Sequence, residues 1–196
     1  MSLILASSSP FRKAILDNLG LTFKVVAPEI NEARKANESP IDLVSRLSKE
    51  KALAVSKSHS GLIIASDQVA TLDSGENEDD VILTKPGSHE NAILQLKKSS
   101  GKTVNFLTGL VLMNTNTQHT QLHVEHFKVT FKILSDNQIL NYLSKEDVLN
   151  CAGSFKSEGL GAELLSQMEG NDPNSLIGLP SIRLIDMLAK EDVQVQ

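Results

Sequence analysis

The sequence predicts an α/β protein built around a mixed β-sheet. Apolar runs at 3–6 and 62–65 are short and uninterrupted, which is typical of strands buried on both faces. Two longer runs, 103–113 and 121–133, are joined by the polar turn 114–119, and this arrangement indicates an antiparallel pair. Helical periodicities separate the shorter runs. A wholly parallel, doubly wound sheet is therefore excluded.

The boundaries of the elements follow from local signals. Ser39 and Pro40 open a helix that runs to about Lys57, because proline is favoured in a first helical turn. In the last strand, Phe127 and Phe131 stand among alternating lysines, which marks one buried and one wet face. The acidic stretch 73–80 indicates a solvated hairpin tip. In chain order we expect strands at 3–6, 22–26, 62–65, 69–72, 81–83, 103–113 and 121–133, and helices beginning near Phe11, Ser39, Ser88, Ser135 and Pro180.

The composition indicates a single domain spanning 1–196. Of the 196 residues, 40% are hydrophobic and 22% are charged, which suits a globular protein with one substantial core. The net charge of −5 argues against a surface that coats nucleic acid. No apolar run reaches the roughly 20 residues that span a bilayer, and serines cut the first run too short for a signal peptide. With a single cysteine, we expect a cytoplasmic protein whose partners include neither nucleic acid nor membrane.

The first strand leads through Ser7, Ser8, Ser9 and Pro10 directly into a helix. A helix start offers unpaired N–H groups and a positive dipole end to an anion. Arg12 in the first turn can add a bidentate grip on phosphate. The glycines and the lysine of a P-loop are missing from this turn. Two interpretations stay open, an ordinary helix cap and a phosphate cradle that includes Ser7, Ser9 and Arg12.

Four charged residues elsewhere suggest chemistry. Asp67 follows the buried strand 62–65, where α/β proteins place catalytic and metal-binding groups, although a turn aspartate is the alternative. Lys51 falls on the apolar stripe of its helix, so it either reaches the helix edge or points into a site. Glu32 lies in an acidic connection, and Lys85 precedes a proline. Such a set suits magnesium-assisted attack of water on a polyphosphate.

Other candidate groups fit catalysis less well. His123 and His126 are three apart on a strand and so point to opposite faces, which argues against a shared zinc. Cys151 has no base beside it in sequence and is typical of a small buried hydrophobe. Ser8 lacks the G-x-S-x-G elbow of a hydrolase nucleophile.

Eight motifs occur in the order of a known family, and together they cover essentially the whole chain. They are LASSSPFR at 5–12, EINE at 29–32, KEKA at 49–52, SDQ at 66–68, TKP at 84–86, SGK at 100–102 with TG at 108–109, AGSFKSEG at 152–159 and GLP at 178–180. The chain resembles the Maf family of nucleoside-triphosphate pyrophosphatases. The resemblance implies an elongated mixed sheet whose flanking helices form two lobes around a nucleotide cleft, as in the inosine-triphosphate pyrophosphatases.

The resemblance also implies a reaction and a set of roles. Water would cleave a nucleoside triphosphate between its α and β phosphates, with a divalent cation (Mg²⁺ or Mn²⁺) as cofactor, and the protein would form a homodimer. Asp67 would accept the proton, and with Glu32 it would bind the metal. The phosphate-binding residues would be Ser7, Ser9, Arg12, Lys51 and Lys85.

Three positions indicate the substrate within the family. Phe11, Gln68 and Glu158 are similar to the tryptophan, glutamine and glutamate of the 7-methyl-GTP branch, whereas members that act on dTTP and UTP tend to carry arginine, threonine and glutamine. A carboxylate can accept both N1–H and N2–H of guanine, and an aromatic ring can stack on the cationic methylated base. Phenylalanine is a weaker platform than tryptophan, and packing of the first helix is the alternative role of Phe11.

Three alternatives to a 7-methyl-GTP pyrophosphatase stay open. The first is the same reaction on dTTP or UTP, and the second is a non-catalytic nucleotide-binding regulator of cell division. The third, a nucleotidyl- or sugar-nucleotide transferase, would need a second acceptor site that the sequence does not show.

Overall fold

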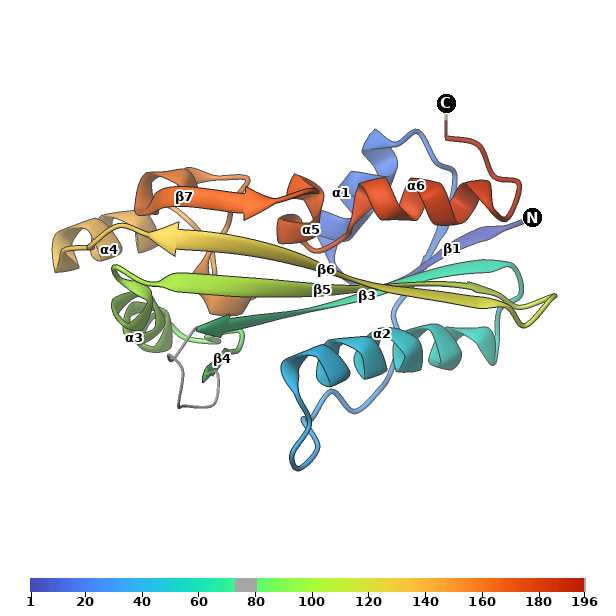
Figure 1. Ribbon diagram of the computed structural model, residues 1–196, viewed down its shortest axis with the longest axis horizontal. Coiled ribbons are helices and arrows are strands. Elements are labelled where there is room, and N and C mark those ends of the chain that lie inside the picture. Colours follow the sequence, from blue (N-terminus) through green and yellow to red (C-terminus); the bar gives the residue numbers. More distant parts are fainter. Residues whose placement is uncertain (73–80, 196) are drawn as a thin grey trace. The chain divides into compact units, whose positions relative to one another are not determined.

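The computed structural model describes residues 1–72 and 81–195, so the hairpin tip expected at 73–80 lies outside the described residues. The strands form a mixed sheet in the order β2-β1-β3-β5-β6-β7, with β4 paired to β3 (Figure 1). The expected α/β fold with a mixed sheet is thus confirmed. The strands are β1 (Leu3–Ala6), β2 (Lys24–Val26), β3 (Leu62–Leu72), β4 (Val81–Leu83), β5 (Thr103–Asn114), β6 (Thr120–Phe131) and β7 (Leu165–Gly170). The α-helices are α1 (Pro10–Asn18), α2 (Pro40–Ser56), α3 (His89–Ser99), α4 (Asp136–Leu143), α5 (Pro173–Ile177) and α6 (Ser181–Ala189).

The chain divides into two compact units. The first unit comprises Met1–Gln68, Thr108–Glu125 and Asp172–Gln196, and the second comprises Val69–Leu107 and His126–Asn171. Among the helices of the described residues, none combines the length and the apolar character needed to cross a bilayer.

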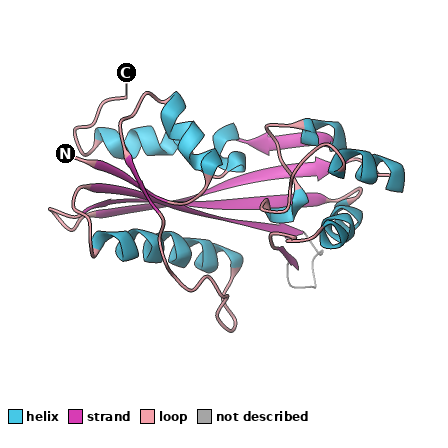
Figure 2. Cartoon of the chain, turned by 180° about the vertical axis from the view of Figure 1, so that it is seen from behind, coloured by secondary structure: helices cyan, strands magenta, loops and turns pink. Residues whose placement is uncertain are grey.

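In the first unit, a parallel set of strands is covered by helices on both faces (Figure 2). β1 pairs in parallel with both β2 and β3, and Ile4 lies opposite Ile63. Alternate residues of β1 enter different cores, because successive side chains of a strand point to opposite faces. Leu5 packs with side chains of α1 and α6, while Ile4 packs with Ala52 and Val55 of α2.

The second unit has its own aromatic cluster. The ring of Phe155 lies 6.1 Å from that of Phe106 and 5.7 Å from that of Phe131, in tilted and edge-to-face arrangements. All three side chains are buried. The tyrosine hydroxyl of Tyr142 on α4 accepts a hydrogen bond from the backbone N–H of Lys156. These contacts fix the start of the AGSFKSEG motif at 152–159, which we call the glycine-rich segment.

Three elements differ from the sequence-based expectation. The break expected at 66–68 is wrong, because β3 is one continuous strand in which the polar side chains of Ser66 and Gln68 find hydrogen-bond acceptors. β7 was missed since its residues are largely exposed and lack an apolar alternation. α5 is not among the expected helices, since it has only five residues; it begins after Asp172, whose side chain caps it.

Candidate active site

The serine turn after β1 both caps α1 and holds Arg12. The Ser9 hydroxyl is the N-cap and accepts a hydrogen bond from the Arg12 backbone N–H at 3.4 Å. The Ser7 hydroxyl accepts from the Ser9 N–H at 3.1 Å and from Arg12 Nη1 at 3.4 Å. The capping interpretation is therefore confirmed for Ser9, while Ser7 is buried beside the guanidinium. Phe11 is half-buried in the first turn of the same helix.

The carbonyl end of α5 gathers side chains from three motifs. The Gly178 carbonyl accepts hydrogen bonds from Arg12 Nε at 2.7 Å and from Ser66 Oγ at 2.8 Å. Gly178 has a φ of 123°, a conformation that side chains rarely adopt, so glycine is required here. The Ser175 carbonyl accepts from Thr108 Oγ1 at 2.8 Å and from Gln68 Nε2 at 2.9 Å. One short helix thus ties the serine turn, the SDQ motif and the TG motif together.

Lys51 points inward and contacts two carboxylates. Its side chain is buried, and its Nζ lies 2.6 Å from Asp67 Oδ1 and 2.8 Å from Glu32 Oε1. Of the two positions that the sequence left open for Lys51, the structure has the inward one, in which the ammonium is paired with two carboxylates and does not reach the helix edge. The Asp67 side chain is also buried, whereas that of Glu32 is 54% exposed.

Arg12 belongs electrostatically to the same group of charges. Burial lowers the pKa of Arg12, while the negative charges of Asp67 and Glu32 raise it again. The two carboxylates therefore help to keep the guanidinium charged inside the protein. Arg12, Glu32, Lys51 and Asp67, which we call the charge cluster, all lie in the first unit.

Close packing of α2 on β5 sets the position of Lys51. A Cβ at Gly109 would lie 2.5 Å from the Ser48 hydroxyl and 2.8 Å from the Val44 carbonyl. Contacts this short leave no space for a side chain on the strand. The glycine of the TG motif therefore lets α2 approach the sheet closely, and Lys51 follows Ser48 by one turn on the same buried face.

The remaining predicted site residues belong to the second unit. Lys85 follows β4, and Glu158 lies in the glycine-rich segment; both are exposed. Burial and the negative charge of Glu158 raise the pKa of the Cys151 thiol to about 11, against the lowering effect of the positive charge of Lys85. Both charges are therefore within electrostatic reach of this thiol, which is protonated at neutral pH and poorly suited to act as a nucleophile.

The donor set fits a divalent cation, although it is small. Among the described residues, no group of three or more His, Cys, Asp or Glu side chains is placed to hold a metal ion. Two carboxylates, those of Asp67 and Glu32, already share one cationic partner in Lys51. Mg²⁺ is commonly held by one or two carboxylates together with substrate phosphates. Asp67 and Glu32 are thus of the kind and number that such an ion takes from a protein.

Sequence reasoning missed one part of the site. Arg46, one turn before Glu50 on α2, binds Glu38 and the backbone of the connection that carries Glu32. The signal was present in the spacing of Arg46 and Glu50, since residues four apart on a helix are neighbours. Its link to Glu38 crosses an irregular loop and could not be seen from periodicity.

The mixed sheet and the charge cluster define an α/β protein with a site suited to phosphate chemistry. The fold is similar to that of the Ham1 protein of Staphylococcus aureus, with a TM-score of 0.52, 12% sequence identity, and coverage of 98% of this chain and 100% of that chain. At the level of sequence, the family model described as Maf-like protein matches residues 2–191. The chain therefore belongs to the Maf family.

Relatives within the family are similar over nearly all of their length. A protein of Pseudoalteromonas atlantica named 7-methyl-GTP pyrophosphatase is 51% identical over 195 residues, which cover 100% of this chain and 97% of the relative. A protein of Alcanivorax borkumensis with the same name is also 51% identical, over 99% of this chain and 96% of the relative. A third protein of that name, from Idiomarina loihiensis, is 49% identical over 96% of this chain and 93% of the relative.

Proposed function

We propose that this protein is a metal-dependent pyrophosphatase that hydrolyses 7-methyl-GTP to 7-methyl-GMP and pyrophosphate. The observation that carries the proposal is the charge cluster, in which the buried Lys51 contacts both Asp67 and Glu32. Such a site offers a proton acceptor, cations for phosphate oxygens and hard ligands for a divalent ion. The relatives at about half identity that bear the name 7-methyl-GTP pyrophosphatase support the same substrate.

Asp67 is the proposed general base. Its Oδ1 is engaged by Lys51 at 2.6 Å, so Oδ2 is the oxygen to which an attacking water would give its proton. The side chain is buried in a strand and its direction is therefore fixed. A fixed carboxylate can orient the water as well as deprotonate it, and both effects lower the barrier to attack on the α phosphate.

Asp67 and Glu32 would hold the divalent cation, which supplies charge to the phosphate oxygens when bound. Ser7, Ser9 and Arg12 at the start of α1 are the proposed phosphate-binding residues of the serine turn. Arg12 is oriented by its hydrogen bond to the Gly178 carbonyl, which leaves further guanidinium N–H groups for phosphate. Lys51 and Lys85 would add positive charge.

The nucleobase is proposed to meet Phe11, Gln68 and Glu158. The amide nitrogen of Gln68 already donates to Thr108, Ser175 and Leu176. Its Oε1 is consequently an acceptor with a fixed direction, which suits an N–H donor of the base, such as N1–H or N2–H of guanine, and not a carbonyl. The half-buried Phe11 would supply the stacking ring for the cationic methylated base.

A nucleotide panel with product identification tests the function. The purified protein with Mg²⁺ or Mn²⁺ is given 7-methyl-GTP, GTP, dTTP and UTP, and pyrophosphate and monophosphate are measured. We expect pyrophosphate to appear fastest from 7-methyl-GTP. A preference for dTTP or UTP would overturn the substrate, and nucleotide binding without any pyrophosphate release would favour the non-catalytic regulator.

A further inference from the structure

Glu32 is carried by a segment with no regular structure of its own. The connection between β2 and α2, residues 27–39, contains neither helix nor strand. Of residues 31–39, all of which the structure describes, Glu38 alone is buried. An exposed loop would ordinarily leave its side chains free to move. The contact of Glu32 with Lys51 therefore requires other contacts that hold the connection against α2.

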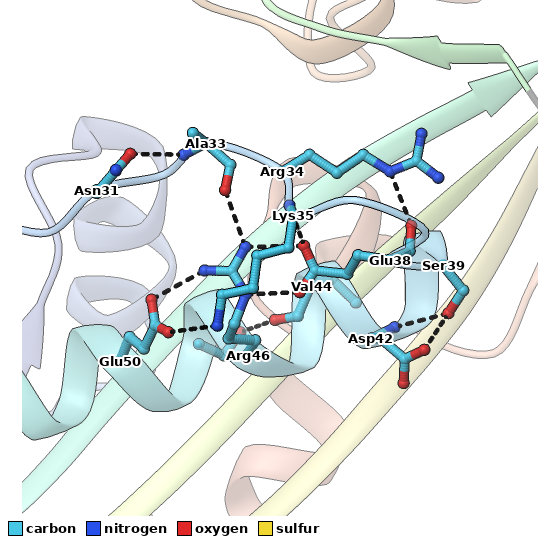
Figure 3. A network of polar contacts seen from close by, with 11 residues as sticks. Asn31, Ala33, Arg34, Lys35, Glu38, Ser39, Asp42, Val44, Arg46 and Glu50 are labelled. Atoms are coloured by element: carbon cyan, nitrogen blue, oxygen red, sulfur yellow. Dashed lines mark hydrogen bonds and ion pairs between the residues drawn. The ribbon is translucent and has the colours of Figure 1, made fainter.

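Arg46 of α2 provides those contacts (Figure 3). Its Nε donates to Glu38 Oε1 at 2.5 Å and its Nη2 to Glu38 Oε2 at 2.8 Å, a bidentate pair. Nη2 also donates to the Ala33 carbonyl at 3.0 Å, directly after Glu32, and Nη1 donates to Glu50 Oε2 at 2.9 Å. One guanidinium thus binds both ends of the segment 33–38 and the helix that carries Lys51.

The connection closes on itself around Glu38. The Lys35 N–H donates to Glu38 Oε2 at 3.0 Å, and Arg34 Nε donates to the Glu38 carbonyl at 2.7 Å. Asn31 accepts a hydrogen bond from the Ala33 N–H at 2.9 Å, on the other side of Glu32. Glu32 is therefore flanked by the engaged side chain of Asn31 and by Ala33, whose backbone N–H and carbonyl both make hydrogen bonds.

The pair differs from an ordinary surface ion pair. The side chains of Arg46 and Glu38 are 14% and 8% exposed, whereas those of Arg183 and Asp186 on α6 are 46% and 59% exposed and their charged atoms are 3.6 Å apart. A planar, bidentate and poorly solvated pair fixes geometry, while an exposed pair contributes little.

We propose that Arg46 and Glu38 are positioning residues that hold Glu32 beside Lys51 and thereby complete the charge cluster. The inference rests on the proposed function in so far as Glu32 serves the reaction. Neither Arg46 nor Glu38 touches the reacting atoms; both act through the backbone of the connection.

A double-mutant cycle tests this route of action. Arg46→Met and Glu38→Gln are measured alone and combined with Glu32→Gln, using pyrophosphate release from the preferred triphosphate. Each single variant should lower kcat/KM about tenfold, since small misplacements in a site are costly. In the Glu32→Gln background the same changes should alter kcat/KM less than about twofold.

Arg46→Lys should restore part of the loss, and Arg183→Met is the matched control expected to leave activity unchanged. Losses that add fully to that of Glu32→Gln would overturn the proposal.

Limited trypsin digestion gives a readout that does not depend on activity. Arg34 and Lys35 are exposed cleavage sites within the segment 33–38. We call the hydrogen bonds from Arg46 to Ala33 and Glu38 the clamp on this segment. Cleavage after them should become at least about fivefold faster in Arg46→Met and Glu38→Gln, and stay unchanged in Arg183→Met. Equal rates in all variants would refute the clamp. If the native protein released no pyrophosphate from any nucleotide, the proposed function would fail, and the digestion would still decide whether Arg46 holds the connection.

Discussion

The two carboxylates that meet at Lys51 are held in opposite ways. Asp67 lies within the 11-residue strand β3, and its side chain is only 11% exposed. Glu32 lies in an irregular connection, and its side chain is 54% exposed. The backbone of the sheet fixes the first, whereas side-chain hydrogen bonds to Arg46 hold the connection of the second. The Lys51 ammonium therefore contacts one carboxylate on a rigid strand, Asp67, and one on a loop that Arg46 holds, Glu32.

This difference in how the two carboxylates are held suits the different roles proposed for Asp67 and Glu32. A proton acceptor must keep its direction to within a fraction of an ångström, which a buried strand provides. The proposed metal ligand Glu32 lies on an exposed loop, so its place depends on the hydrogen bonds that Arg46 makes to that loop. We therefore expect the two carboxylates to respond differently to substitution, to metal concentration and to pH.

The largest effect is expected at Asp67. Asp67→Asn keeps the shape of the side chain and removes its ability to accept a proton, so kcat should fall about 100-fold or more. Steady-state pyrophosphate release checks this, and thermal unfolding shows whether the variant remains folded. The exposed pair between Lys13 and Asp17 offers a control, since Asp17→Asn should leave kcat unchanged. A rate close to that of the native protein would remove Asp67 from the proposed mechanism.

An intermediate effect is expected at Glu32. Glu32→Gln removes one of two anionic ligands, so activity at low Mg²⁺ should fall about tenfold and recover largely as Mg²⁺ is raised. Asp67→Asn should show no such recovery. Titration of the rate with Mg²⁺ distinguishes the two variants. A loss at Glu32 that persists at saturating Mg²⁺ would mean that the two carboxylates do not divide the work in this way.

The smallest effect concerns stability against acid. Hydrogen bonds from Arg46 lower the pKa of Glu38 from its usual 4.5 to about 2. Between about pH 4.5 and 2, Glu38 is therefore protonated in the unfolded chain and ionised in the native protein. The stability that this carboxylate contributes above about pH 4.5 is consequently lost as the pH falls toward 2. Urea unfolding should show native protein more stable than Glu38→Gln near neutral pH, with the gap narrowing in acid. A gap that is constant with pH would contradict the clamp.

The predictable part of the site is the part that regular structure carries. Asp67 was found because it follows a buried apolar run, and Lys51 because it interrupts an apolar stripe. Both signals are local in the sequence. The inward direction of Lys51 was left open, because a stripe defines a face of a helix without saying whether a long side chain bends to its edge.

The unpredicted part depends on contacts between distant segments. The hydrogen bonds from Ser66 and Gln68 to the end of α5 join residues more than 100 positions apart, and they explain why polar residues continue a strand that was expected to break. The contact of Arg46 with Glu38 spans an irregular loop. No pattern along the chain reports such pairings, since their partners are chosen by the folded topology.

The charge cluster also has a consequence for the order in which ligands bind. It contains two cationic groups, Arg12 and Lys51, and two anionic groups, Glu32 and Asp67, so its own charges cancel. A divalent cation alone would leave an excess of positive charge, and a triphosphate alone an excess of negative charge. When the two arrive together, the cation offsets part of the negative charge that the triphosphate brings. In these terms, the proposed site would accept a triphosphate at a lower electrostatic cost as its metal complex than as the free anion.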